Sequence, residues 1–478
     1  MDHGPPAFIR PALRLVSALA FALVLPAHAA TAQPVESPAP VPTAAPSPLP
    51  AAGAIPANIA LDVTGVPAAD ADVLDAQIRA ELDRRIRPTL RQGSAVRFGP
   101  IAPWPLIPLA SGTRAAVNVT VTIEGDATSG PVQGVTTVTL NGVVVPPPSP
   151  SVLYLSDDPE YLQTDGLVFR GDVAAGRAAR LYYYHSAIGL PHDLDVVLTA
   201  TVPSRVHLIA SAAGPDLDVM SAGHTVSRDF LRFEQGNAGI VADVEPGKPF
   251  IVRHALLLQA EVVAGTVDAH VLSGGPVGVS VVAAPAGSTP ETFLRGPRVP
   301  YDGHRRHGTF DLTSFGALAQ LYTAGGPDTA VQYGSRTSTP RNVDPADDGR
   351  DLGDYGVVHR ITFTLANPTD APSLVYLYEK PLGGPVRSSF IVDGRLKEMG
   401  CVRLPQPYWV ATYQLPPHST GMSNTVTMTD GGSFYPLEFG ASATPPQPYT
   451  PPVGTADGCS PVATPFADPT PAPLGRRP

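Results

Sequence analysis

Residues 354–384 constrain the fold most strongly, because apolar residues recur there at every second position. Side chains alternate between the two faces of a β-strand, so this period predicts a strand with one apolar and one mostly polar face. Residues 367–372, which include two prolines, indicate a turn, and a second apolar run follows at residues 374–378. We therefore predict two strands joined by a short turn, a hairpin. The alternating residues of the first strand are Tyr355, Val357, His359, Ile361, Phe363 and Leu365.

Composition extends this interpretation to most of the chain. Of its 478 residues, 57 are proline and 45 are glycine, which favours short strands, turns and extended linkers over helices. A chain of this length is expected to form two or three domains rather than one core. Short apolar runs at residues 196–202, 250–258, 266–272 and 277–284 are spaced as in a sandwich or barrel. The predicted fold class is mainly β, with two β-sandwich domains (Ig-like or jelly-roll-like), a small α+β unit before them and Pro-rich linkers.

Changes in composition indicate where these domains begin and end. Proline-rich tracts separate the units, and proline-rich segments of this kind form semi-stiff spacers. The predicted segments are a signal peptide (1–29), a Pro/Ala-rich linker (30–56), a small α+β domain (57–147), a β-sandwich (148–297), a second β-sandwich (298–443) and a Pro-rich tail (444–478).

The small α+β unit carries the clearest helical pattern. Leu74, Ile78, Leu82 and Ile86 recur every four residues, which places them on one side of a helix that ends before Pro88. Alternating residues at 117–123 and 138–140 predict strands that this helix covers. In the first sandwich, residues 224–233 give the only other indication of a helix.

The N-terminus resembles an export signal. Arg10 and Arg14 precede an apolar run at residues 15–25, and small residues at 27–29 offer a cleavage site. The apolar run is shorter than the ~20 residues that a membrane-spanning helix needs. We expect a secreted, periplasmic or cell-envelope protein with no membrane span after cleavage; a retained membrane anchor is the alternative.

Charge and cysteine content agree with export. Thirty-two basic and 42 acidic residues give a net charge of −10, which argues against nucleic acid as a partner. The chain has two cysteines, Cys401 and Cys459, and in an oxidising compartment such a pair predicts one disulfide. Two free thiols are the alternative.

Two segments contain possible metal ligands. Asp302, His304 and His307 lie in one short polar segment and could hold a metal together, although a polar linker loop explains them equally well. A second, acidic segment supplies carboxylates, the ligands that calcium prefers, on a glycine-bearing loop; solvated turn carboxylates are the alternative. Its five candidate residues are Asp344, Asp347, Asp348, Asp351 and Asp354.

Aromatic and histidine residues form a third candidate cluster. Tyr182, Tyr183 and Tyr184 could stack on a sugar or a partner protein, but tyrosine is also a favoured strand residue that packs well in a core. His185 and His192 accompany them, and we interpret His185 as a structural histidine. The sequence contains no nucleophile elbow, zincin or nucleotide-binding motif.

Four motifs together carry a family resemblance: SDDPE (156–160), RLYYYH (180–185), GDYGV (353–357) and LANPTD (365–370). They resemble a family of uncharacterised, exported bacterial β-rich proteins, classed as a domain of unknown function. The resemblance covers about residues 150–440 and implies secretion and a β-fold, without an activity.

The functional expectation follows from export, β-fold and absent catalytic motifs. We expect a structural or adhesive module of the cell surface that binds a protein or a glycan and needs no cofactor. The alternative is a carbohydrate-active or metal-assisted hydrolase that uses carboxylates such as Asp193, Asp195 or those of residues 344–354.

Overall fold

The computed structural model describes residues 49–448, except 66–70, 92, 104–108, 110–111 and 336–338. The predicted signal peptide and Cys459 lie outside the described residues, as do most of the predicted linker and tail. No helix in the described part of the chain is both long and apolar enough to cross a membrane.

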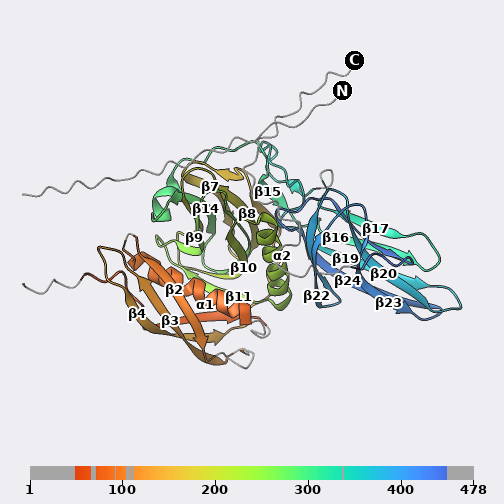
Figure 1. The fold of residues 1–478 in the computed structure, drawn as a ribbon, viewed down its shortest axis with the longest axis horizontal. Helices are drawn as coiled ribbons and strands as arrows, with labels where there is room; N and C mark the ends of the chain where they lie inside the picture. Colours follow the sequence, from red (N-terminus) through yellow and green to blue (C-terminus); the bar gives the residue numbers. More distant parts are fainter. Residues whose placement is uncertain are drawn as a thin grey trace, which may run out of the picture. The chain divides into compact units, whose positions relative to one another are not determined.

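The fold is mainly β, as predicted. The described residues form two α-helices and twenty-five strands in four sheets (Figure 1). The longest sheet, named here the long sheet, contains β18 (Arg341–Asn342), β15 (His307–Asp311), β5 (Val152–Ser156), β8 (Ala178–Ala187), β13 (Val262–Ser273), β10 (Ser204–Asp216), β11 (Gly239–Val244), β1 (Asn58–Thr64), β4 (Val132–Gly142), β3 (Arg114–Glu124) and β2 (Ala95–Ala102) in that order, with β6 (Tyr161–Leu162) beside β8.

The predicted α+β unit forms one end of the long sheet. Helix α1 (Ala71–Ile86) covers it through Leu74, Ile78, Leu82 and Ile86, all of which are buried, and a short 3₁₀ turn at Arg87–Thr89 follows. Strand β1 pairs in parallel with β4 and antiparallel with β11, so hydrogen bonding continues from this unit into the next. The long sheet therefore extends across residue 147, the predicted end of the small α+β domain. The predicted domain boundaries remain predictions.

In the first sandwich, the middle of the long sheet packs face to face against a shorter sheet. That sheet has the order β12 (Phe250–Leu257), β9 (His192–Ala200), β14 (Val277–Pro285) and β7 (Gly166–Val173), and a 3₁₀ turn at Pro290–Arg295 follows β14. Leu181 and Tyr183 of β8 pack into the core between the two sheets. Tyr182 and Tyr184 belong to a separate buried cluster with side chains of α2. All three tyrosines are therefore core residues, as one of the two interpretations of this motif predicted.

Helix α2 (Val219–Gly236) is longer than the predicted segment 224–233. Asp218 caps its start by accepting hydrogen bonds from the amides of Met220 and Ser221, and Asn237 ends it in a left-handed conformation. Its buried face contacts β10 and β13 on one side and β21 on the other (Figure 1). The apolar residues of that face are Met220, Ala222, Val226, Phe230, Leu231 and Phe233.

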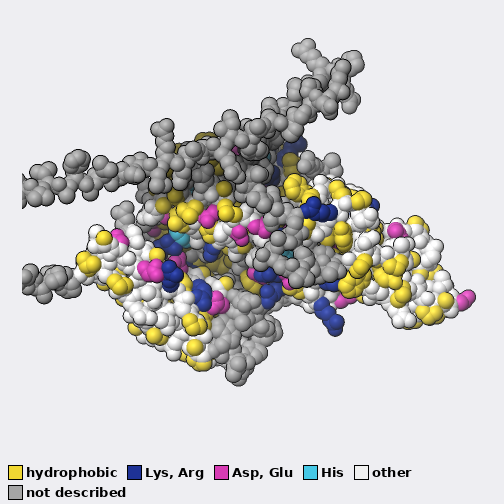
Figure 2. Space-filling view, in the orientation of Figure 1, with side chains coloured by type: hydrophobic (Ala, Val, Ile, Leu, Met, Phe, Trp, Pro, Cys, Tyr) yellow, Lys and Arg dark blue, Asp and Glu magenta, His cyan; other side chains and the backbone are white. Residues whose placement is uncertain are grey.

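The second sandwich consists of a five-stranded and a four-stranded sheet. The first has the order β16 (Ala317–Thr323), β19 (Val358–Asn367), β24 (Ser419–Met428), β21 (Val386–Val392) and β22 (Arg395–Val402). The second has the order β17 (Thr329–Tyr333), β25 (Leu437–Ser442), β20 (Ser373–Pro381) and β23 (Tyr408–Leu415). Over this sandwich, the face in Figure 2 carries mostly uncharged and hydrophobic side chains.

The predicted hairpin at residues 354–384 is wrong in its pairing. Both strands exist, but β19 pairs with β16 and β24, whereas β20 pairs with β23 and β25 in the opposite sheet. Asn367 holds the connection, since its side chain binds the carbonyl oxygens of Ala371, Leu415 and Pro416. Because both strands contribute apolar faces to one core, the chain crosses from sheet to sheet instead of folding back within one.

Candidate functional site

A pocket of about 460 Å³ opens where loops after β5 and before β15 meet loops of the second sandwich. Its volume lies within the ~300–1,000 Å³ typical of small-molecule sites. Charged, aromatic and glycine residues line it. They are Asp157, Glu160, Tyr182, Tyr184, Arg306, Gly334, Leu352, Gly353, Tyr355, Gly383, Gly431, Gly432, Ser433, Phe434 and Tyr435.

The charged wall is built on the antiparallel pair of β5 and β15. The Arg306 guanidinium donates to Asp157 through Nε and to Glu160 through Nη2. Burial by itself would lower the pKa of Arg306, but these two carboxylates raise it above its ordinary value. Burial raises the pKa of Asp157, while Arg306 opposes that rise. Asp157 Oδ1 is buried and has no hydrogen-bond partner among the described residues.

Aromatic rings form another part of the lining. Tyr182 and Tyr355 stack with ring centroids 5.7 Å apart, and Tyr355 meets Tyr435 edge to face at 6.4 Å. Burial raises the pKa of all three phenols well above its usual range, so they stay neutral. Phe434 is 57% exposed, whereas these rings are half-buried or buried. The pocket thus combines neutral hydroxyl groups with apolar ring surface.

Glycines let the loop between β24 and β25 approach these rings. A Cβ atom on Gly431 would lie 2.7 Å from the Tyr182 hydroxyl oxygen, and one on Gly432 would lie 2.9 Å from backbone atoms of Val219. Such distances exclude a side chain unless the neighbours move. The backbone itself therefore forms part of this wall.

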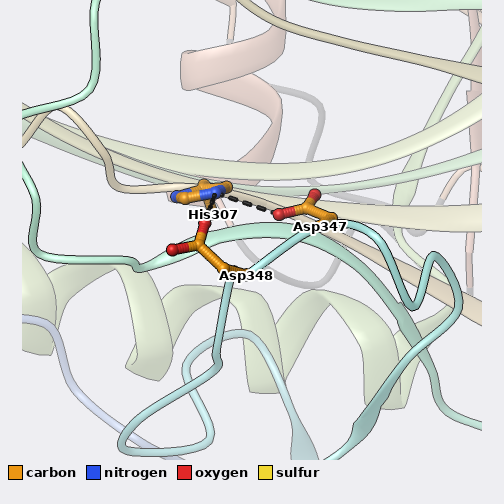
Figure 3. Close-up of side chains that lie close together, drawn as sticks. All are labelled: His307, Asp347 and Asp348. Carbon is orange, nitrogen blue, oxygen red and sulfur yellow. Dashed lines mark ion pairs between the residues drawn. The ribbon is translucent and has the colours of Figure 1, made fainter.

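The two predicted metal-binding segments meet beside the pocket at His307. Its Nε2 atom lies 3.0 Å from Asp347 Oδ1 and 3.7 Å from Asp348 Oδ1 (Figure 3). Its Nδ1 atom lies 2.9 Å from Asp158 Oδ2. Within the described residues, His307, Asp347 and Asp348 are the group of three whose donor atoms lie within 4.8 Å of one another. These side chains could hold a metal ion.

The other residues of those segments have different surroundings. Asp302 binds His304 at 2.6 Å, and its second carboxylate oxygen accepts from the backbone amide of Glu160, so neither residue joins His307 in a three-ligand group. Asp344 is exposed and accepts from the amide of Ala346. The structure therefore does not bring Asp302, His304 and His307 together as one ligand set.

The two last aspartates of the acidic segment point into the interior. Asp351 accepts from the amide of Tyr355, and Asp354 accepts from that of Gly334. Burial raises the pKa of Asp351 well above its usual range and that of Asp354 to about 7. The five aspartates predicted to bind calcium therefore do not converge on one point, and only Asp347 and Asp348 share a site.

The remaining sequence candidates belong to the core of the first sandwich. His185 lies between Ser156 Oγ and the carbonyl oxygen of Pro159, and burial lowers its pKa to about 4. Asp193 and Asp195 lie on β9, 3.5 Å and 2.8 Å from His254 nitrogens. His192 binds Asp165 at 2.9 Å. None of these residues lines the pocket.

Sequence reasoning did not identify the charged wall. Asp157 and Glu160 lie in the SDDPE motif, and Arg306 lies between the two histidines considered as metal ligands. Arg306 is 149 residues from Asp157 and 146 from Glu160 in the chain, and the pairing of β5 with β15 brings it to them. The opposite charges of the SDDPE motif and of Arg306 were the available signal, but nothing in the sequence indicated that the two segments meet.

Comparisons with known proteins give no functional indication. No protein-family model matches the chain, and no curated protein matches it. Among solved structures, Lac15 from a marine microbial metagenome is 11% identical, covers 68% of this chain and 71% of its own, and has a TM-score of 0.13. The PBSX exported protein XepA is 7% identical, with 59% of this chain and 87% of its own chain covered and a TM-score of 0.15. The CBM22 tandem of Paenibacillus barcinonensis Xyn10C is 9% identical, with 74% of this chain and 84% of its own chain covered and a TM-score of 0.11. TM-scores this low support no conclusion about the function of this protein.

Proposed function

We propose that this protein is an exported binding protein of the cell envelope and that its pocket takes a short glycan segment. The observation that carries this proposal is the buried, unpartnered Asp157 Oδ1 in a pocket with aromatic walls. An unpaired buried acceptor costs free energy, and a ligand hydroxyl group would satisfy it.

The chemistry of the lining favours a sugar over other small ligands. Sugar hydroxyl groups donate to carboxylates and accept from guanidinium or phenol groups, while the C–H faces of the ring pack on aromatic side chains. The positive charge of Arg306 is already paired with two carboxyl groups, Asp157 and Glu160, so the charged wall disfavours an anion such as phosphate. A neutral polyhydroxylated ligand fits both features.

Binding agrees better with this arrangement than hydrolysis does. A glycosidase needs one carboxyl group that donates a proton and a second that acts as base or nucleophile. Here one guanidinium, that of Arg306, binds both carboxylates of the pocket, so neither carboxyl group is free to take a separate acid or base role. Asp193 and Asp195, the carboxylates suggested for a hydrolase, do not line the pocket.

Export, signal cleavage and the Cys401–Cys459 disulfide belong to the same proposal. Cys401 lies in β22, and Cys459 lies outside the described residues. Cell fractionation with N-terminal sequencing tests export, and thiol trapping before and after reduction tests the disulfide. Recovery of the unprocessed chain in the cytosol with both thiols reactive would refute this part.

Glycan binding is tested with the purified protein on a glycan array and in a cell-wall pull-down. We expect Asp157→Asn to weaken binding by ~10-fold or more, because the carboxylate loses charge. Phe434→Ala is expected to weaken it by ~3- to 10-fold through lost ring contact. Leu321→Ala is the matched control, since Leu321 is a similarly exposed apolar residue (59%) that does not line the pocket.

Two outcomes contradict the proposal. Absence of binding to any glycan or cell-wall fraction would leave a purely structural role. Release of shorter oligosaccharides from a bound glycan would instead support the hydrolase alternative, and loss of that release in Asp157→Asn would identify the same pocket as its site.

A further inference from the structure

His307 faces two carboxylates with one nitrogen and a third carboxylate with the other. Asp347 and Asp348 approach Nε2 from neighbouring positions of one loop (Figure 3). Asp158 approaches Nδ1 from the loop after β5. The imidazole is 4% exposed, whereas Asp348 is 66% exposed. One side of the group is therefore open to solvent.

Asp158 has the geometry of a group that orients a metal-binding histidine. Besides the imidazole, it accepts hydrogen bonds from the amides of Asp302 and Arg305, at 2.7 and 2.9 Å. These bonds hold the carboxylate as an acceptor, so a neutral imidazole would carry its proton on Nδ1 and would direct its Nε2 lone pair at Asp347 and Asp348. Metal-ligating histidines commonly donate their second ring N–H to a carboxylate in this way.

The spacing of the three donor atoms suits a small divalent ion. Bonds of ~2.0–2.2 Å in a tetrahedral site place neighbouring donor atoms ~3.3–3.6 Å apart. The two distances from Nε2, 3.0 and 3.7 Å, lie close to that interval. Imidazole nitrogen with carboxylate oxygen is a ligand set that suits Zn²⁺ and similar transition metals, whereas Ca²⁺ prefers oxygen ligands alone.

We propose that His307, Asp347 and Asp348 bind a divalent transition-metal ion of the Zn²⁺ class, with solvent in the remaining coordination position. The ion joins β15 to the loop between β18 and β19. Leu352, Gly353 and Tyr355, which line the pocket, follow in the same loop, so the ion also restrains that wall. This inference does not depend on the ligand proposed for the pocket.

Isothermal titration of the untagged protein with Zn²⁺, Co²⁺ and Ca²⁺ tests this inference, because a histidine tag would bind the same ions. We expect one Zn²⁺ per chain with a dissociation constant in the ~micromolar range, and Ca²⁺ binding at least ~10-fold weaker. Asp347→Asn and Asp348→Asn should each weaken Zn²⁺ binding by ~10-fold or more, and both together by ~100-fold. Bound Co²⁺ should show a visible absorption band that the double variant lacks.

Asp344→Asn is the matched control. Asp344 lies in the same loop, is exposed and stands outside the group of three, so its substitution should leave Zn²⁺ affinity unchanged. Substitution of the exposed Asp348 leaves the buried imidazole in place, which separates loss of a ligand from loss of the fold.

Three results overturn the proposal. In the first, neither Zn²⁺ nor Co²⁺ binds with a dissociation constant below ~1 mM. The double variant could bind Zn²⁺ as the wild type does. Ca²⁺ could bind more tightly than Zn²⁺. In the first two cases, His307 is an imidazolium that forms ion pairs with Asp158 and Asp347 and holds no metal.

Discussion

His224 joins helix α2 to the second sandwich, and its substitution tests how strongly that contact is held. Its Nδ1 atom lies 2.7 Å from Asp430 Oδ2 and its Nε2 atom 3.3 Å from Glu398 Oε1. The imidazole is 15% exposed and the Asp430 side chain is fully buried. Burial by itself would lower the pKa of His224, but the two carboxylates raise it to about 9.

The size and sign of the effect follow from this pKa. A rise from 6.5 in the unfolded chain to about 9 in the folded protein corresponds to about 3 kcal/mol of stability, which is an upper bound because burial raises the pKa of the partner carboxyl, Asp430. Because the folded pKa is the higher one, this contribution is complete below about pH 6.5 and is lost as the pH rises through about 9. His224→Gln should therefore destabilise the protein most at mildly acidic pH.

Guanidinium unfolding of the wild type and of His224→Gln at about pH 6, 7.5 and 10 measures this difference. We expect up to about 3 kcal/mol at the lowest pH and much less at the highest. His418→Gln is the matched control, because His418 binds Asp370 at a similar 2.8 Å but is 64% exposed, and surface pairs contribute ~0–1 kcal/mol. A difference that does not change with pH, or an equal loss in the control, would refute the reasoning.

A double-mutant cycle separates the ion pair from other effects of the substitution. Asp430→Asn alone leaves the imidazolium without its nearest carboxylate, so it should cost ~3 kcal/mol or more. The double variant should be more stable than the sum of the single losses predicts, by ~2–3 kcal/mol. Additive losses would show that His224 and Asp430 do not interact.

Three further substitutions test the buried contacts that organise the fold. Arg180→Met removes a guanidinium that binds Asp268 at 2.7 and 2.9 Å in the core, and should lower the unfolding free energy by ~3–5 kcal/mol in a denaturation assay. Arg341→Met is the control: Arg341 is 81% exposed, and its substitution should change the unfolding free energy by less than ~0.5 kcal/mol in the same assay. Phe230→Ala empties space under α2 and should cost ~3–5 kcal/mol, which a thermal melt would show. Gly223→Ala places a Cβ 1.9 Å from a backbone carbonyl oxygen of the second sandwich, so we expect ~2 kcal/mol or more of destabilisation; unchanged melting would contradict that close approach.

The local elements could be predicted because their patterns are short in range. Helix α1 follows from four apolar residues at helical spacing, and all four are buried as that spacing requires. Alternation likewise locates β3, β4 and β19. Helix α2 begins before the predicted segment 224–233, which Gly223, a poor helix former, precedes; in the structure Gly223 is buried in α2 and lies against Gly431.

The candidate site depends on contacts between distant segments. His307 and Asp347 were assigned to two separate metal clusters, although the pairing of β15 with β18 brings their loops together. Asp351 and Asp354 were grouped with Asp347 on residue type, but they turn inward and accept from backbone amides. The aspartate residue type indicated a possible oxygen ligand for a metal. The direction of each side chain decided whether its carboxylate lies at the candidate metal site.

The amino-acid sequence by itself determined that this chain is mainly β, because the period of its apolar residues is a property of neighbouring positions. Only the tertiary structure decided which strands pair, that β19 and β20 lie in opposite sheets, and that Asp157, Glu160 and Arg306 meet in one pocket. Pairing depends on which apolar faces fit together across more than a hundred residues, and alternation within one strand does not specify its partner.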